Sequence, residues 1–462
     1  MKREALVKGL LAILAVLLLI SVLTGLERER VFAKEREAAE TADRDVWMMQ
    51  GERNPHSAAH FSRYAFRPQA PLALLDPGTS DFAGMAVWLE AHFQDPAAFR
   101  RAEDGSDLNR FAPLTPAFIL LYGASLLIFL MMFASIAGER EDGTLRQLLA
   151  SGVGSRSFFA GKLAAGLRLT LGTLVLGFVG LAAFTLFTSP AELGPDALAR
   201  LFLLLLVYSA YAICCIAIAI AVSACFRTRQ GAFLALTAIW VGMTVLAPHL
   251  AIDWSLRTHP QPDPRTVTTQ LRAASDAYYA DKDRQKQIEQ EVLDRYGVAT
   301  IEELPINYGA YSLQVSEELS FPEFDRVYAE LDQIHSRQES VVRRFSFFSP
   351  AIATANLSRA LAGTDRLAQG AFTSSAEMHR REMIRLLNED YMYNAKNDGS
   401  IYKADAELWS QFTDYVPAPP TLGQTLRAHW VDLLTLLVWL VISASLAYAL
   451  VVRATRHEVS KT

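Results

Sequence analysis

The strongest constraint on this chain comes from six apolar stretches, each long enough to cross a lipid bilayer. A hydrocarbon core about 30 Å thick needs roughly 20 residues of apolar helix. The stretches are 9–26, 114–137, 163–187, 198–224, 231–252 and 431–452. Charges stand only near their ends, at Arg168, Arg200 and Asp432. Because a spanning helix satisfies its own backbone hydrogen bonds, we expect an α-helical membrane protein with six transmembrane helices.

The short segments between these spans differ in their content of lysine and arginine, which indicates an orientation. Basic residues gather before the first span, in 138–162, in 225–230 and after residue 452. By the positive-inside rule these segments are cytoplasmic. The larger insertion, 253–430, carries 26 acidic and 19 basic residues, as suits an outer face. We therefore expect a multi-pass protein of a bacterial inner membrane, with the N- and C-termini both in the cytoplasm.

This topology divides the chain into five regions. They are residues 1–26 (N-terminus and first span), 27–113 (first extracytoplasmic insertion), 114–252 (spans two to five, with the cytoplasmic loop 138–162), 253–430 (second extracytoplasmic insertion) and 431–462 (sixth span and cytoplasmic tail).

The first apolar run allows two interpretations. Lys2, Arg3 and Lys8 before an apolar stretch also fit a secretory signal peptide. The run is long for the apolar part of such a peptide, and the residues at 24–27 make a poor cleavage site. We favour an uncleaved anchor, and the remaining topology is the same in either case.

The two insertions read as soluble sequence, and the larger one reads as helical. Residues 27–45 have a charged, helix-like composition, whereas proline and glycine punctuate 54–84. Within 253–430, apolar residues at alternating spacings of three and four predict a long helix through 324–345. Two shorter stripes occur at Ile288, Val292 and Tyr296 and at Leu408, Phe412 and Tyr415. The region is large enough to fold as a soluble unit, and we expect these helices to pack on one another.

The composition excludes several classes of function. The net charge is only −5, which gives no overall basic field for nucleic acid. The three cysteines, Cys214, Cys215 and Cys225, lie in or beside one apolar run, which excludes a disulfide framework and a cysteine-based zinc site. We interpret them as small, buried helix residues. No Walker A loop is present, because Gly161 and Lys162 are followed by Leu163, so ATP hydrolysis by a P-loop requires a second protein.

No catalytic or cofactor-binding constellation stands out. His56 and His60 have the i, i+4 spacing that suits a metal on a helix. Pro55 precedes them and no third ligand lies nearby in the sequence, so we interpret both as structural and expect no metal site. We also expect no cofactor and no enzymatic activity in this chain.

The most informative segment is the loop 138–162. Asp142 and Thr144 are residues that can cap a helix, and Leu145, Leu148 and Leu149 follow at i, i+3, i+4. This pattern predicts a short amphipathic helix under the membrane, of the kind that docks into a groove on a soluble partner. By pattern alone, a helix that merely lies at the interface explains it equally well.

The loop resembles the signature loop of type-2 ABC exporter permeases. The matching residues are Glu139, Arg140, Glu141, Gly143, Thr144 and Leu145, then Leu148, Leu149 and Ser151, then Ser155 and Arg156, then Gly161 and Lys162. The chain departs from the family pattern at one place: the family often has a proline shortly after the serine that Ser151 matches, and this chain has Val153 and Gly154 there. In that family the loop forms a coupling helix that meets the ATPase.

The resemblance implies a role for each matched residue. Glu139, Arg140 and Glu141 would make polar contacts with the ATPase, together with Arg156, and Gly143 and Thr144 would form the turn and cap. Leu145, Leu148 and Leu149 would fill the docking groove. It further implies two copies of a separate ABC ATPase, and a homodimer or a heterodimer with a second permease. The substrate is not implied.

The outer regions resemble a bacterial permease subfamily whose outer domain has no assigned function. The matching segments are 54–60, 67–68, 71–72, 75–78, 84, 348–350 and 361–364. One alternative remains open, a membrane-anchored receptor or scaffold with a ligand-sensing outer domain. It explains region 253–430 as well, but it gives no reason for the composition of loop 138–162. A membrane enzyme is disfavoured because no carboxylate or histidine lies deep within a span.

Overall fold

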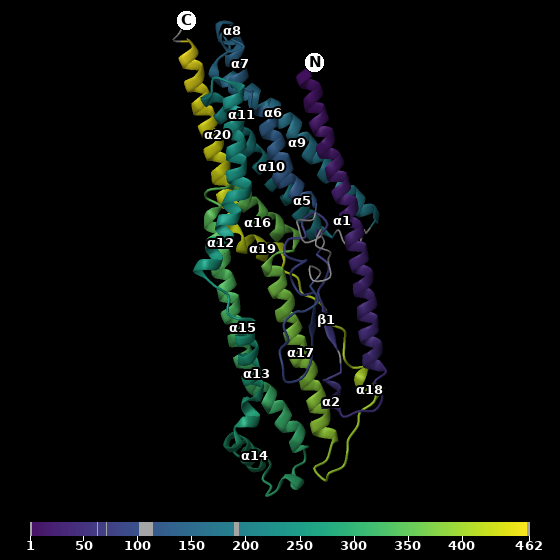
Figure 1. Ribbon diagram of the computed structural model, residues 1–462. Coiled ribbons are helices and arrows are strands. Elements are labelled where there is room, and N and C mark those ends of the chain that lie inside the picture. The colour runs from purple at the N-terminus through teal and green to yellow at the C-terminus, as the bar shows by residue number, and fades with distance from the viewer. Residues whose placement is uncertain (1, 62, 71, 101–113, 189–193, 460–462) are drawn as a thin grey trace.

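The computed structural model describes residues 2–61, 63–70, 72–100, 114–188 and 194–459. Helix makes up 75% of it and strand is nearly absent, which confirms the α-helical fold class. Within these described residues, six helical segments are long and apolar enough to span a membrane, as the sequence predicts. They are Gly9–Met48, Pro116–Glu141, Ser155–Gly180, Pro195–Cys225, Arg229–Thr258 and Trp430–Val459. Both termini lie at one end of the elongated molecule (Figure 1).

The spanning region contains the following elements. They are α1 (Lys2–Met48), α5 (Pro116–Phe118), η1 (Ile119–Gly123), α6 (Ala124–Met132), α7 (Ala137–Glu141), α8 (Thr144–Ala150), α9 (Ser155–Thr188), α10 (Pro195–Cys225), α11 (Arg229–Val241), η3 (Gly242–Leu246), α12 (Ala247–Thr258) and α20 (Trp430–Val459). Helix α1 continues well past the apolar stretch 9–26, so the charged stretch 27–45 is helical as predicted.

The insertions contain the remaining elements. They are α2 (Pro55–Ala58), β1 (Tyr64–Phe66), β2 (Ala86–Trp88), α13 (Pro264–Ala280), α14 (Lys282–Tyr296), η4 (Ile301–Glu303), α15 (Tyr308–Phe345), α16 (Pro350–Ala362), α17 (Arg366–Asn394), α18 (Ala406–Trp409) and α19 (Leu422–Ala428). β1 and β2 pair antiparallel. The predicted long helix is α15, and its stripe buries Phe324, Val327 and Val341. The predicted helical stripe of Leu408, Phe412 and Tyr415 is not confirmed, because α18 ends at Trp409 and the two aromatic residues follow it.

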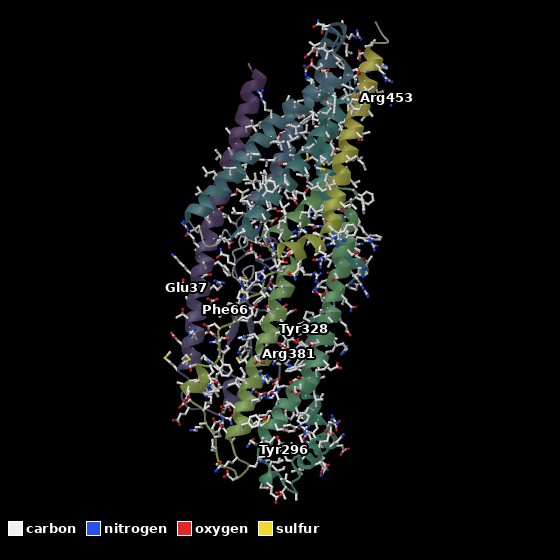
Figure 2. The ribbon with its side chains drawn as sticks, turned by 180° about the vertical axis from the view of Figure 1, so that it is seen from behind. Glu37, Phe66, Tyr296, Tyr328, Arg381 and Arg453 are labelled. Atoms are coloured by element: carbon white, nitrogen blue, oxygen red, sulfur yellow. The ribbon has the colours of Figure 1, made fainter. Side chains whose placement is uncertain are left out.

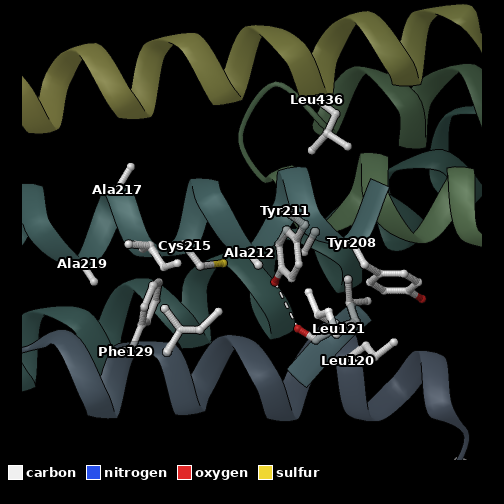
Figure 3. Close-up of a cluster of buried hydrophobic side chains, with 14 of the residues drawn as sticks. Leu120, Leu121, Phe129, Tyr208, Tyr211, Ala212, Cys215, Ala217, Ala219 and Leu436 are labelled. Atoms are coloured by element: carbon white, nitrogen blue, oxygen red, sulfur yellow. Dashed lines mark hydrogen bonds between the residues drawn. The ribbon is translucent and has the colours of Figure 1, made fainter. Parts of the chain in front are cut away.

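Helix α10 is the centre of the membrane bundle and packs against α6, α9, α16 and α20. Small residues on its buried face, Cys215, Ala217 and Ala219, let neighbouring helices approach closely (Figure 3). Packing within the chain therefore explains them. Cys214 is buried as well, but Cys225 at the end of α10 is exposed, so the prediction that all three thiols are buried is wrong for Cys225.

Two spans contain a π-helical turn, η1 in the second and η3 in the fifth. Such turns leave carbonyl groups that need other donors. Tyr211 on α10 donates its hydroxyl to the carbonyl oxygen of Leu121 in η1 at 3.1 Å, the dashed line in Figure 3. Ser349 donates to the carbonyl oxygen of Met243 in η3 at 2.7 Å. These hydroxyls stabilise the two irregular turns inside the apolar bundle.

The two insertions share one hydrophobic core. It joins Trp47, Ala58 and Val87 of the first insertion to Phe372 and Trp409 of the second. The indole Nε1 of Trp47 donates to the carbonyl oxygen of Trp409 at 3.0 Å, and the two rings meet edge to face. The insertions therefore pack as one body at the end of the molecule opposite the termini.

Candidate functional site

The loop between the second and third spans forms two short helices, α7 and α8, at the same end as both termini (Figure 1). Arg453 on α20 lies at this end, and Tyr296 on α14 lies at the other (Figure 2). The predicted amphipathic helix is α8. Gly143 precedes it with φ +74°, a left-handed conformation that glycine adopts without a steric penalty. Gly143 thus forms the turn into α8, as expected.

The expected helix cap differs from the one observed. The cap residue is Gly143, and no side chain accepts a hydrogen bond there. Thr144 is the first residue of α8, and its hydroxyl instead donates to the Glu139 carboxylate. Asp142 is paired with the Arg229 guanidinium at the start of α11. The acidic residues of the loop are therefore engaged in bonds that fold the loop onto its own chain.

Arg229 and Lys162 hold the acidic side of the loop. Glu141 accepts the backbone N–H of Arg229 at 2.7 Å, which also fixes the first turn of α11. Lys162 on α9 donates to Glu139 at 2.7 Å. Ser223 on α10 accepts the backbone N–H groups of Ile136 and Ala137 at 3.0 Å each, where the second span turns into α7. The loop is thus joined to α9, α10 and α11.

The other side of the loop is attached to α20. Arg146 donates to Glu458 at 3.1 Å, and Arg140 lies 3.7 Å from the same carboxylate. Ser155 and Thr455 join their hydroxyls at 2.7 Å, and Arg156 donates to the Tyr448 hydroxyl at 3.2 Å. Sequence reasoning missed Ser223, Arg229, Tyr448 and Glu458, because residues so distant along the chain carry no local pattern that links them to the loop.

The three leucines of α8 do not form a free docking ridge. Leu145 is only 1% exposed, and Leu148 and Leu149 are half-buried against the bundle core. Filling a partner's groove with Leu145 is therefore inconsistent with this packing. The exposed residues on α8 and directly beside it are Glu141, Asp142, Gly143, Arg146, Gln147, Ala150, Ser151 and Gly152.

A second polar cluster lies at the opposite end of the bundle, where the insertions meet the spans. Asp432 at the start of α20 is fully buried, and Arg343 donates to it at 3.1 Å. His429 lies between Asp365 and Asp432, with its two ring nitrogens at 3.0 and 3.2 Å from their carboxylates. Burial alone would lower the pKa of His429, but these two hydrogen bonds outweigh it and raise the pKa to about 9.

Helix α16 connects this junction to the central helix α10. Ser358 on α16 shares a hydrogen bond of 2.8 Å with the Tyr208 hydroxyl and donates to Asp76 at 2.5 Å. Burial raises the pKa of Asp76, and the Ser358 bond opposes that shift. Arg200 on α10 donates to the carbonyl oxygen of Pro420 at 2.7 Å. Helices α10 and α20 are therefore both hydrogen-bonded to the segments that carry the insertions.

An apolar cavity of about 590 Å³ opens between α1, α6 and α9. Its walls include Leu14, Leu18, Ile128, Leu174 and Phe178. Apart from Thr170 and Thr173, the lining is apolar and suits hydrocarbon.

Two family models match the chain and together span most of it. Residues 94–256 match the ABC-2 family transporter protein model, which covers spans two to five and the α7–α8 loop. The chain carries an ABC-2 family transporter membrane domain. Residues 266–418 match a domain of unknown function, DUF3526, which corresponds to most of the larger insertion. No curated protein and no solved structure matches the chain.

These matches confirm the resemblance to a type-2 ABC permease with an additional domain, which loop 138–162 and the outer segments indicate. The protein is a multi-pass membrane protein, and its ABC-2 domain supports a permease of an ABC transporter. A protein of this family is a membrane component of a transporter, and the family implies work with an ATP-binding subunit.

Proposed function

We propose that this chain is the transmembrane subunit of an ATP-driven exporter, in which α8 meets a separate ATPase at the cytoplasmic face of a bacterial inner membrane. The observation that carries the proposal is the position of α8. It projects at the end that holds both termini, and the basic short segments predict that this end is cytoplasmic.

The contact surface consists of the exposed part of the loop. Arg146, Gln147 and Ala150 face solvent on α8, Ser151 faces solvent directly after it, and Glu141, Asp142 and Gly143 face solvent before it. Leu148 and Leu149 contribute their exposed edges, whereas Glu139 and Leu145 fix the helix from beneath. Arg156, also exposed, extends the surface onto α9.

Force applied to α8 has a direct route into the membrane bundle. Arg146 and Arg140 contact Glu458 on α20, and α20 packs along the length of α10. Helix α20 reaches the cluster around His429 through Asp432, and α10 contacts the neighbouring segment of the second insertion through the hydrogen bond from Arg200 to Pro420. Displacement of α8 by the ATPase is thus transmitted to the insertions at the other end, and it accompanies movement of a substrate of unassigned chemistry.

The active unit is a dimer of this chain, or of this chain and a second permease, with two ATPase copies. The surface of α9 supports an interface because its small residues Ala160, Gly161, Ala164 and Ala165 are exposed, and a Cβ atom at Gly161 would meet no atom within 4 Å. Small residues of this kind let membrane helices approach closely.

Site-specific photocrosslinking tests the ATPase contact. A photoreactive amino acid at Gln147 on α8 is expected to crosslink to a protein with a Walker A motif. The same group at exposed Gln290 on α14, at the other end of the molecule, is expected to give no such product. Crosslinking from both positions, or from neither, contradicts the assignment.

A charge-insertion variant tests coupling without disturbing the core. Ala150→Arg adds a large cation to the exposed face of α8, and Ala273→Arg makes the same change on the exposed face of α13. We expect Ala150→Arg to reduce copurification of the ATPase and ATP turnover about tenfold or more, and Ala273→Arg to leave both unchanged. Equal behaviour of the two variants would argue against docking at α8.

A further inference from the structure

Three histidines from two segments of the first insertion converge in the joint body of the insertions. His56 lies in the single turn of α2, His60 follows one turn later, and His92 comes from the loop after β2. One ring nitrogen of each lies within 4.8 Å of the other two. The Nε2 atoms of His56 and His92 are 2.9 Å apart, and the His60 ring centre lies 5.3 and 5.5 Å from the other two rings.

The remaining nitrogens of two of these rings face buried acceptors. Nδ1 of His56 lies 3.0 Å from the amide oxygen of Asn388, which is fully buried on α17. Nδ1 of His92 lies 3.1 Å from Glu317 on α15, whose side chain is fully buried. An acceptor on the far nitrogen of a metal-binding histidine fixes the ring and leaves the other nitrogen free to coordinate. Asn388 does this for His56, whereas Glu317 lies beside Nδ1 of His92 without the geometry of a hydrogen bond.

The backbone of His92 adopts an uncommon conformation that the residues next to it do not share. Its φ is +65°, a left-handed conformation that is uncommon for a residue other than glycine. The backbone N–H of His92 donates to Glu317 at 2.5 Å, and Glu317 lies 3.5 Å from buried Arg380. A costly backbone conformation held by buried charged groups is typical of residues that are positioned for a function.

The cluster is open on one side. His60 and His92 line a cavity of about 720 Å³ between α13 and α15, together with the carboxylates of Glu90 and Asp95. This opening gives an entry path for a cation and room for a fourth ligand.

We propose that His56, His60 and His92 form a metal site for a divalent transition ion of the zinc class. Three imidazoles without a thiolate suit Zn²⁺, and Co²⁺ takes the same geometry. Metal–nitrogen bonds of about 2.0–2.1 Å place tetrahedral ligands roughly 3.3 Å apart, so His56 and His92 need to separate by less than about half an ångström. The fourth position faces the cavity and takes water or a donor atom of a ligand.

The sequence alone gives no reason to expect this site, because no third ligand lies near His56 and His60 along the chain. His92 is 32 positions beyond His60, in a loop with no metal-binding pattern, and only the fold brings it to α2. The bound ion would connect the first insertion, through the second-sphere groups Glu317 and Asn388, to α15 and α17 of the second.

Metal binding is tested on the full-length protein, purified with a tag that contains no histidine and stripped with a chelator. We expect wild-type protein to bind one Zn²⁺ per chain by elemental analysis and to gain thermal stability from it. Co²⁺ is expected to give the visible absorption of a four-coordinate site, which Zn²⁺ then abolishes.

His60→Ala is the main variant, because the exposed His60 side chain can be removed with little effect on folding. His92→Asn is the second, because asparagine tolerates the left-handed backbone. Both are expected to lose the equivalent of Zn²⁺ and the Co²⁺ spectrum. The control His379→Ala, in the same body but outside the cluster, is expected to retain them. Equal zinc content in wild type and His60→Ala, or no zinc in wild type, would overturn the proposal.

Discussion

Arg146 on α8 donates a hydrogen bond of 3.1 Å to Glu458 in the last turn of α20, across 312 positions of sequence. The Arg140 guanidinium lies 3.7 Å from the other oxygen of the same carboxylate. One carboxylate therefore connects Arg140 and Arg146 of loop 138–162 to the last membrane helix.

Glu458→Gln is expected to loosen α8 from α20. The Glu458 and Arg140 side chains are only 11% and 10% exposed, so an uncharged partner leaves a buried guanidinium without its counter-charge. A loss of about 1–3 kcal/mol is expected for such a pair. Thermal denaturation in detergent measures it, with exposed Glu407→Gln as the control. Equal melting temperatures for the two variants would show that the carboxylate does not hold the loop.

Gly143→Ala is expected to disturb the turn into α8 through the backbone alone. A methyl group at this position meets no atom within 4 Å, so the cost arises from the left-handed φ of +74° and is about 1–2 kcal/mol. Gly154→Ala is a matched control, because that position is also open and lacks a positive φ. Limited proteolysis of the loop is expected to be faster in Gly143→Ala than in Gly154→Ala, and a reversed order would contradict this reading of the turn.

The position of His429 between the carboxylates of Asp365 and Asp432 predicts that the stability of the folded protein depends on pH. An unfolded histidine has a pKa of about 6.5, and the folded pKa is raised to about 9. The protonated ring therefore contributes its full stabilisation below pH 6.5, and this contribution is lost as the pH rises through 9. The contribution is of the order of 3 kcal/mol. Melting temperatures between pH 6 and 10 are expected to fall more steeply for wild type than for His429→Gln, with His335→Gln behaving as wild type. Parallel curves of melting temperature against pH for wild type and His429→Gln would show that protonated His429 does not stabilise the fold.

The sequence predicts the parts of this fold that depend on local pattern. Apolar length defines the six spans, and three-and-four spacing defines α15 with Phe324 and Val327 on its buried face. Gly143 is predictable as a turn residue because only its own backbone is involved. Leu145 shows the limit of such reasoning, since its periodicity identifies the apolar face of α8 but not the surface that the face covers.

Contacts between segments that lie far apart in the sequence could not be predicted and are visible only in the structure. Arg229 and Glu458 bind the loop from positions far along the chain, and no local composition marks either residue. The same holds for His92, which completes a cluster that His56 and His60 begin. Asp432, predicted only as the edge of a span, is instead a buried partner of Arg343 and His429.

The most direct test of the account is the side of the membrane on which α8 lies. Arg146→Cys and, separately, Gln290→Cys are made in a Cys225→Ser background, which removes the exposed native thiol. Spheroplasts are then treated with a maleimide that cannot cross the membrane. We predict labelling at residue 290 in intact spheroplasts and at residue 146 only after lysis. Labelling of residue 146 in intact spheroplasts would contradict both the topology and the ATPase contact.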